Sequence, residues 1–336
     1  MIAIGPAIRR PVIAGIVSLL AALAAGPVSA QYSDLELGLT QAMRDSLLED
    51  YDNIFPIMGR KALEHGVRLP APLGLNLNYF AASQGIAISN LGLAVNDGEW
   101  VDLSDVIKFD ATTSEVENVN GRVDLWVLPF LNLYGMGGYS WAKTSVAVSA
   151  PVEFTSFAEM EGSLYGCGLT AAAGLQGFWF AFDTNWAWSD LDVLDEVVRT
   201  RVLGLRVGKN YRWRDKSVAA WVGAMKVDLD TGTQGTVRLA DVFPELPPEL
   251  GDRFQEWYDG LTPPQQAVVD RIRDGLEGGA GDTEIHYRLD KAPTEPWSMA
   301  VGAQIEFSRQ WQFRTEFNFL GDRTSILTNI VYRIDL

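Results

Sequence analysis

Few side chains in this sequence could carry out acid–base or nucleophilic chemistry. The chain has two histidines, His65 and His286, and one cysteine, Cys167. His286 follows Asp282 and Glu284, so it could serve as the general base of a hydrolase if a nucleophile stood beside it. No nucleophile motif accompanies it, and we expect a solvated loop histidine. His65 lies at the end of a predicted helix, where a C-terminal capping role explains it.

Other signatures of catalytic or cofactor sites are absent from the sequence. It contains no Gly-Lys-Ser/Thr phosphate loop, no His-Glu-x-x-His motif and no EF-hand spacing. One cysteine allows neither an intramolecular disulfide nor a multi-cysteine metal site, and Cys167 is expected to be buried or to face lipid. The formal net charge of −16 offers no basic surface to nucleic acid. We therefore predict a protein without catalytic residues, metal or cofactor.

The first thirty residues have the composition of a secretory signal peptide. Arg9 and Arg10 form a positive n-region, an apolar stretch covers 12–25, and Val28-Ser29-Ala30 fits the cleavage pattern of small residues. A membrane-spanning helix needs about 20 apolar residues, and no uninterrupted apolar stretch of that kind follows residue 30. The sequence thus predicts an exported chain that crosses no membrane by helices.

Polar and apolar residues alternate with a period of two along much of the remaining chain. In 311–320 one face carries Trp311 and Phe317, whereas the other carries Arg314 and Glu316. Such alternation is typical of strands with one apolar and one polar face. The apolar faces have aromatic residues near strand ends, as the girdles of membrane barrels do, and the polar faces have charges of both signs, as a polar lumen does.

These patterns predict an all-β fold, an antiparallel transmembrane β-barrel of about ten strands, with a range of about 8–12. Short turns alternate with long connections, which places the short turns and both termini in the periplasm. Extra pairing between 85–95 and 282–289 is left open as a source of further strands. The expected strands are 73–83, 112–128, 131–147, 163–175, 178–189, 197–208, 216–229, 297–307, 311–320 and 324–336, and the expected outer loops are 96–105, 150–162, 189–196 and 230–295.

Two segments outside the strands are expected to be partly helical. Residues 31–70 form an N-terminal segment, in the periplasm or in the lumen as a plug, with Thr40 as a possible helix N-cap. The loop 230–295 is inserted into a barrel of 71–336 and contains a helix predicted from Thr262, where two prolines follow the cap. Loops longer than about 15 residues are usually functional or disordered, so this loop is the main candidate for specificity.

The last strand resembles the C-terminal strand of Gram-negative outer-membrane β-barrel proteins. Its apolar residues alternate and end the chain, although members of that class usually end in phenylalanine. The resemblance covers the class and carries over no functional residue. It implies a location in the cell outer membrane among lipid and lipopolysaccharide, and a C-terminal signal read by the barrel-assembly machinery. The residues that carry this signal are Ile330, Tyr332, Ile334 and Leu336.

The polar faces of the predicted strands supply the candidate site residues. A barrel of this width has an interior that side chains largely fill, whereas open porins need about sixteen strands. Charges of both signs would pair across it, either closing the barrel as a rigid plug or lining a narrow path for small solutes. The predicted lumen-lining residues are Asn76, Asn78, Asp124, Asn132, Asp183, Asn185, Arg206, Lys226, Glu306, Arg314, Glu316 and Arg333, with Asn329 and Asp335 on the same faces.

Three functions fit this outline. The first is a narrow or gated channel for small solutes, gated by the N-terminal segment or by loop 230–295. The second is a closed barrel that displays its acidic loops to a partner or to lipopolysaccharide. The third is an outer-membrane hydrolase that uses His286. We favour the channel because barrels of this class are commonly transporters, although a fold does not by itself fix a function.

Overall fold

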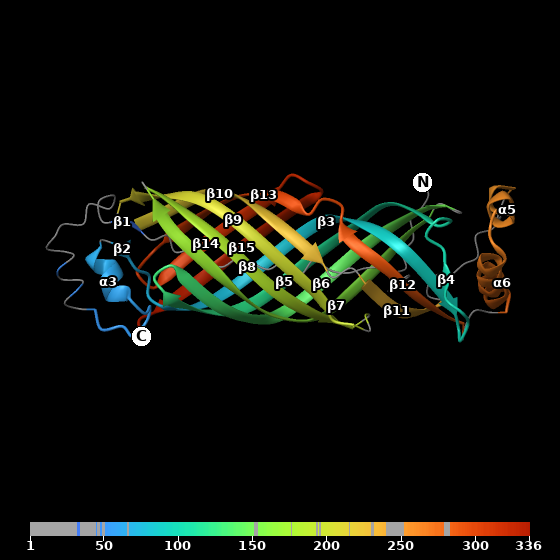
Figure 1. Ribbon diagram of the computed structural model, residues 1–336, viewed down its shortest axis with the longest axis horizontal. Coiled ribbons are helices and arrows are strands. Elements are labelled where there is room, and N and C mark those ends of the chain that lie inside the picture. The colour runs from blue at the N-terminus through green and yellow to red at the C-terminus, as the bar shows by residue number, and fades with distance from the viewer. Residues whose placement is uncertain are drawn as a thin grey trace, which may run out of the picture.

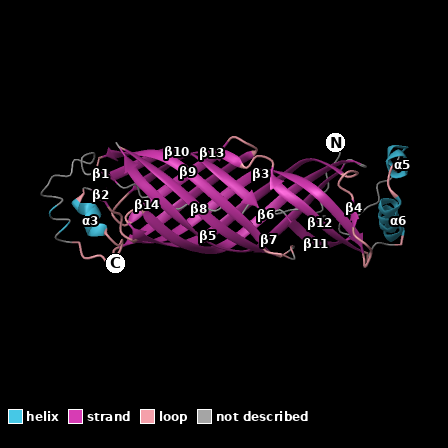
Figure 2. Cartoon of the chain, viewed as in Figure 1, coloured by secondary structure: helices cyan, strands magenta, loops and turns pink. Residues whose placement is uncertain are grey.

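The computed structural model is a long antiparallel β-barrel with small helical elements beyond both of its ends (Figure 1). Strands make up the body of the molecule, as Figure 2 shows. The structure describes residues 32–33, 45, 48, 51–65, 67–150, 154–175, 177–192, 194, 196–214, 216–229, 232–239, 252–278 and 283–336. The predicted signal peptide and Thr40 lie outside the described residues.

Ten strands pair in a closed ring, as predicted. Each is antiparallel to its neighbours, and β15 pairs with β3 to close the ring. The ring consists of β3 (Leu73–Val95), β5 (Lys108–Leu128), β6 (Leu131–Ala150), β7 (Phe154–Leu175), β8 (Phe178–Leu191), β9 (Val198–Trp213), β10 (Lys216–Leu229), β13 (Trp297–Glu306), β14 (Trp311–Phe319) and β15 (Arg323–Ile334). We call its two ends the short-turn end, where the C-terminus lies, and the long-loop end (Figure 1).

The two faces of the strands follow the predicted alternation. On β15, Asn329 and Val331 are buried whereas Ile330 and Tyr332 are exposed. Since side chains in a strand alternate between faces, the buried set points into the barrel and the exposed set points outward. The outward set forms an apolar band that includes Leu75, Leu77, Val119, Val123, Leu133, Phe180, Phe182, Leu205, Val222, Met299, Val301, Phe317, Ile326 and Ile330.

Several strands are longer than predicted. β3 has 23 residues, compared with the about 9–11 that cross a bilayer. The predicted outer loop 150–162 is wrong, because β7 begins at Phe154 and pairs with β6 from there onward. Val146, Ala158 and Met160 point inward in this hairpin and are buried. The long strands therefore continue the sheet past the level at which the shorter strands end.

Two further strands widen this extension. β12 (Glu284–Pro293) pairs with Ile86–Val95 of β3, on the side that β15 leaves, and β11 (Gly232–Arg238) pairs with β12. The pairing between 85–95 and 282–289 that the sequence left open is therefore present, outside the ten-stranded ring. His286 lies within β12, so the expectation of a loop histidine is wrong. The short β4 (Val101–Asp102) also pairs with β3.

A pair of helices lies beyond the extension, at the long-loop end (Figure 1). They are α5 (Asp252–Asp259) and α6 (Pro263–Glu277). As predicted, α6 starts after Thr262, whose backbone N–H donates to the side chain of Gln265 at 2.9 Å. Val268 of α6 is buried in an apolar cluster with residues of β3 and β12. The helices are thus docked on the extension.

Val268→Asp should release α6 without unfolding the barrel. Loss of a buried valine removes about 2 kcal/mol of packing, or about thirtyfold in the docking equilibrium. Limited proteolysis should then cut the α5–α6 segment faster, while the heat-modifiable gel mobility of the barrel stays unchanged. Ala267→Asp places the same charge at an exposed position of the same helix. Equal cleavage of the two variants would show that Val268 does not dock the helix.

The N-terminal elements cover the short-turn end. β1 (Tyr32–Ser33) pairs with β2 (Val67–Arg68), and α3 (Gly59–Glu64) lies near the C-terminus (Figure 1). Ile54 N donates to Leu336 O at 3.0 Å. The described part of 31–70 is therefore outside the lumen. His65 is the C-cap of α3, as predicted. No helix among the described residues is long and apolar enough to cross a membrane.

Candidate functional site

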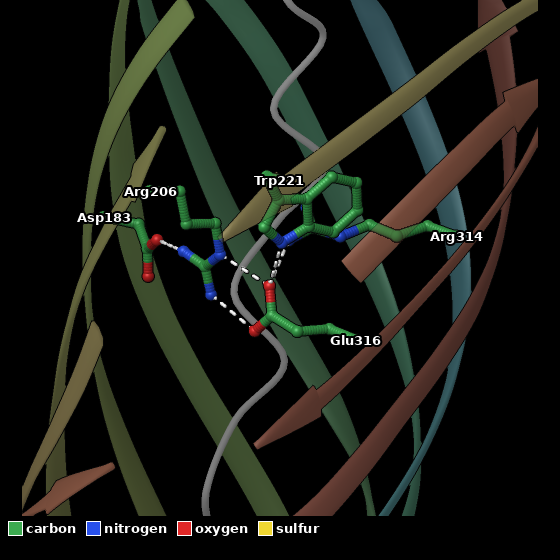
Figure 3. A network of polar contacts seen from close by, with 5 residues as sticks. All are labelled: Asp183, Arg206, Trp221, Arg314 and Glu316. Carbon is green, nitrogen blue, oxygen red and sulfur yellow. Dashed lines mark hydrogen bonds and ion pairs between the residues drawn. The ribbon is translucent and has the colours of Figure 1, made fainter. Parts of the chain in front are cut away.

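The barrel interior contains a polar network centred on Glu316 of β14 (Figure 3). Arg206 of β9 donates to both carboxylate oxygens, from Nε to Oε2 at 2.6 Å and from Nη2 to Oε1 at 2.8 Å. Trp221 Nε1 and Arg314 Nη2 also donate to Oε2, at 2.7 and 3.1 Å. Arg206 forms a second ion pair with Asp183 of β8. Side chains of four strands thus meet inside the barrel.

Charge balance explains how this network can exist out of contact with water. Its four charged side chains are at most 2% exposed. A buried charge that lacks a partner is strongly destabilising, whereas a paired charge with further hydrogen bonds is tolerated. Two guanidinium groups here face two carboxylates. Arg206 binds Glu316 in the bidentate geometry that the planar guanidinium group favours. The network therefore holds β8, β9, β10 and β14 in fixed positions.

A second network surrounds Asp124 of β5. Arg333 Nη1 donates to Asp124 Oδ1 at 2.7 Å, and the amides of Asn76 and Asn132 donate to its two oxygens, both at 2.7 Å. Arg122 donates to Asn132 Oδ1 at 3.3 Å. These contacts connect β3, β5, β6 and β15. Together, the two networks contain side chains from eight of the ten strands of the ring, all but β7 and β13.

Most of the predicted lumen residues lie inside the barrel. Glu306 occupies the inward face of β13 near its end, where it is half-buried and accepts a bond from Gln312 at 3.3 Å. Those that are buried on inward faces are Asn76, Asn78, Asp124, Asn132, Asp183, Asn185, Arg206, Arg314, Glu316, Asn329 and Arg333. The networks bring together eight of them, and Asn329 links Asn76 and Asn78 at 3.1 and 2.9 Å.

Two of the predicted positions lie elsewhere. Lys226 sits between the buried residues Met225 and Val227, so it points outward, where it pairs with Asp228 at 2.6 Å. Lys226 stands five positions after Trp221, which points inward, and residues an odd number of positions apart lie on opposite faces of a strand. Asp335 follows the end of β15 and is exposed.

Sequence reasoning missed several polar residues of the interior. On β5, counting back in twos from Asp124 would have found three of them. Others lie at strand ends that were predicted as turns or loops. The missed residues are Gln84, Asn118, Asn120, Arg122, Lys291 and Arg323.

Three tryptophans pack inside the barrel toward its short-turn end. Trp126, Trp179 and Trp221 form a buried cluster, with the rings of Trp179 and Trp221 5.9 Å apart. Each of the latter two faces a glycine in the neighbouring strand, Gly208 and Gly302 respectively. A Cβ at either glycine would run into the indole ring. The glycines therefore provide the space in which the rings lie flat over the next strand.

The interior toward the long-loop end contains many buried apolar side chains beside polar ones such as Ser189, Thr200 and Arg323. One buried cluster of hydrophobic side chains spans inward-facing residues of seven strands. It consists of Ile86, Val116, Tyr134, Met136, Ala142, Val146, Val148, Ala158, Met160, Leu164, Ala187, Leu191, Val198, Val202, Met225 and Val227. The lumen thus changes in character along its axis, from tryptophans through charge networks to a mixture of apolar and polar side chains.

The candidate catalytic groups are engaged in ordinary contacts. His286 Nδ1 lies 2.8 Å from the hydroxyl of Thr236, and His65 Nδ1 lies 2.7 Å from the carbonyl oxygen of Lys61. Cys167 is exposed on the outward face of β7, one of the two positions expected for it. Within the described ranges, no group of three or more His, Cys, Asp or Glu side chains is arranged to hold a metal ion.

Aromatic side chains border the outer apolar band at both ends. Near the short turns these include Phe130, Phe178, Trp213, Phe307 and Trp311, and on the other side Trp141, Tyr165 and Trp297. A closed ring of strands with an apolar outer band between aromatic girdles is the architecture that crosses hydrocarbon without unpaired backbone groups. The chain is an outer-membrane β-barrel. Its extension and helices lie beyond the band, at the long-loop end.

No protein-family model and no curated protein matches the sequence of this barrel. Among solved structures, the β-domain of the Bordetella autotransporter BrkA aligns with 78% of this chain and 100% of its own, at 10% identity and a TM-score of 0.38. The translocator domain of the autotransporter NalP from Neisseria meningitidis aligns with 78% and 89%, at 11% identity and 0.33. An outer membrane channel from Pseudomonas putida F1 aligns with 79% and 96%, at 10% and 0.31. Likenesses this distant concern the fold alone.

Proposed function

We propose that this barrel is a narrow or gated channel for small solutes. The observation that carries the proposal is a set of inward-facing polar atoms without protein partners. Among the described residues, the hydroxyls of Thr170, Ser189 and Thr200 and the Nδ2 of Asn118 are buried and have no hydrogen-bond partner. Buried polar groups are almost always bonded, and water serves where the protein does not. Water molecules that complete these bonds would make the interior hydrated, which would support a solute path rather than a dry plug.

The charge networks make this path narrow. Arg206 reaches Glu316 from three strands away around the ring, and Arg333 reaches Asp124 from two strands away. Solute would have to pass beside these side chains or displace them, which is how a gated channel differs from an open porin. No catalytic step is part of the proposal, because His65 and His286 are engaged in local contacts away from these networks.

A second candidate is a closed barrel that displays its extracellular elements. It is supported by the docking of α5 and α6, in which Trp257 Nε1 donates to Val106 O at 2.9 Å and Val268 is buried. In either case we propose the lipopolysaccharide leaflet and the assembly machinery as partners. Of the residues of the proposed assembly signal, Ile330 and Tyr332 are exposed on the outward side of β15, and Leu336 is exposed beyond its end.

Single-channel recording in planar lipid bilayers tests the channel. We expect steady, salt-dependent current from the refolded chain. Ala172 faces inward and is buried, whereas the adjacent Ala173 is exposed on the outside. Ala172→Trp should therefore reduce the conductance by about half or more by filling the lumen, and Ala173→Trp should leave it unchanged. Silence from a barrel shown to be folded by its heat-modifiable mobility would reject the channel in favour of display.

A further inference from the structure

Arg323 is a buried cation that no acidic side chain of the described structure neutralises. It begins β15 on the inward face and is 2% exposed. Its Nη1 donates to Oε1 of Gln84 at 3.2 Å. Its Nε and Nη2 have no hydrogen-bond partner among the described residues. None of the ion pairs between described residues includes it.

Three other interior arginines are neutralised within the protein. Arg206, Arg314 and Arg333 each form an ion pair with a buried carboxylate. In Arg206, Nε and Nη2 donate to the carboxylate of Glu316. In Arg323, the same two nitrogen atoms have no hydrogen-bond partner among the described residues. An uncompensated buried cation is costly, so a partner from outside the chain would explain why the residue is tolerated.

Apart from Gln84, apolar side chains lie near Arg323. Its guanidinium carbon lies 6.0 Å from the ring centroid of Phe80. Phe80, Ala82 and Leu327 form a buried apolar cluster on the inward faces of β3 and β15. Val116, which pairs with Ala82, belongs to the large apolar cluster of the interior. A ligand held by Arg323 would therefore lie against hydrocarbon on several sides.

A second buried basic residue follows on the same side of β3. β15 pairs with one edge of β3 as far as Gln84, which is opposite Arg323. β12 pairs with the same edge farther along, where Lys291 is opposite Ile88. The two backbones are about 13 Å apart along the strand. Lys291 is 1% exposed, and burial lowers the pKa of its amine well below its usual range. The interior on this side of β3 therefore contains two buried basic residues.

We propose that the lumen beside Arg323 binds an organic anion, a carboxylate carried on an apolar body. The carboxylate would accept two hydrogen bonds from Nε and Nη2 of Arg323 in the bidentate geometry that guanidinium groups favour. The apolar body would lie against Phe80 and Leu327. This inference rests on the proposed function, and it names the class of solute that the channel would take.

Equilibrium dialysis with the full mature chain in lipid nanodiscs tests this site. The probe is 4-phenylbutyrate, with 4-phenylbutanol, 4-phenylbutylammonium and inorganic phosphate as comparisons and empty nanodiscs as the background. We expect saturable binding of 4-phenylbutyrate above this background and none of the others. Arg323→Gln should weaken that binding by about tenfold or more. Arg201→Gln removes the same charge from an exposed outer position and should change nothing.

The melting temperature of the Arg323→Gln variant distinguishes a ligand-binding role of Arg323 from a structural one. If Arg323 serves a ligand, removing an uncompensated cation should leave the melting temperature equal or higher. A lower melting temperature with unchanged binding would overturn the proposal, as would equal binding of phenylbutyrate and phenylbutanol, or phosphate binding as tight as phenylbutyrate. Current without phenylbutyrate binding would reject the site and leave the channel standing. Phenylbutyrate binding without current would reject the channel and leave the site standing.

Discussion

Glu316→Gln should lower the free energy of unfolding by about 3–5 kcal/mol. The substitution keeps the shape of the side chain and removes the carboxylate that accepts bonds from Arg206, Trp221 and Arg314. Asp183 would then be the only carboxylate opposite two buried guanidinium groups. Urea titration in lipid vesicles, followed by tryptophan fluorescence, measures the change. Glu115→Gln is the control, because Glu115 is exposed on the outer face.

A double variant distinguishes charge balance from lost hydrogen bonds. Adding Arg314→Gln to Glu316→Gln leaves one cation, Arg206, opposite one anion, Asp183. If unpaired charge dominates the loss, the double variant should be more stable than Glu316→Gln alone, and the cycle should give a strong coupling. Additive losses would mean that the network stabilises the barrel through hydrogen bonds rather than through charge balance.

The ten strands could be predicted because their two faces meet different surroundings. Where the outer face meets lipid, apolar residues such as Phe317 alternate sharply with inward charges such as Glu316, and the predicted bounds are nearly right. Beyond the apolar band the outer face carries Glu115, Lys143 and Glu159. There the contrast between the two faces fades, so the long strands were predicted too short and the hairpin 150–162 was taken for a loop.

The candidate site was predictable in part for a related reason. Parity alone puts Arg206 and Glu316 inside, but their pairing joins residues 110 apart in sequence on strands that are not neighbours. Which inward residues meet depends on the tilt and stagger of the strands, and these are properties of the closed barrel rather than of any one segment. Arg323 was missed because it stands at the very start of its strand.

Gly302→Val should cost about 3 kcal/mol of stability by displacing a ring. A side chain at this position would run into the indole of Trp221, which lies over Gly302 and donates to Glu316. The variant would thus both overfill the interior and break a bond of the charge network. Near-ultraviolet circular dichroism and thermal unfolding report the two effects.

Two further variants test whether the ring is the cause. Gly121→Val introduces the same side chain where a Cβ would have no close neighbour other than the carbonyl oxygen of Gly137 at 3.9 Å, so we expect a change of less than about 1 kcal/mol. Trp221→Ala combined with Gly302→Val removes the obstructing ring. The double variant should therefore lose less unfolding free energy than the sum of the losses of the two single variants. If the losses simply add, Gly302 matters for its backbone and not for the space it gives Trp221.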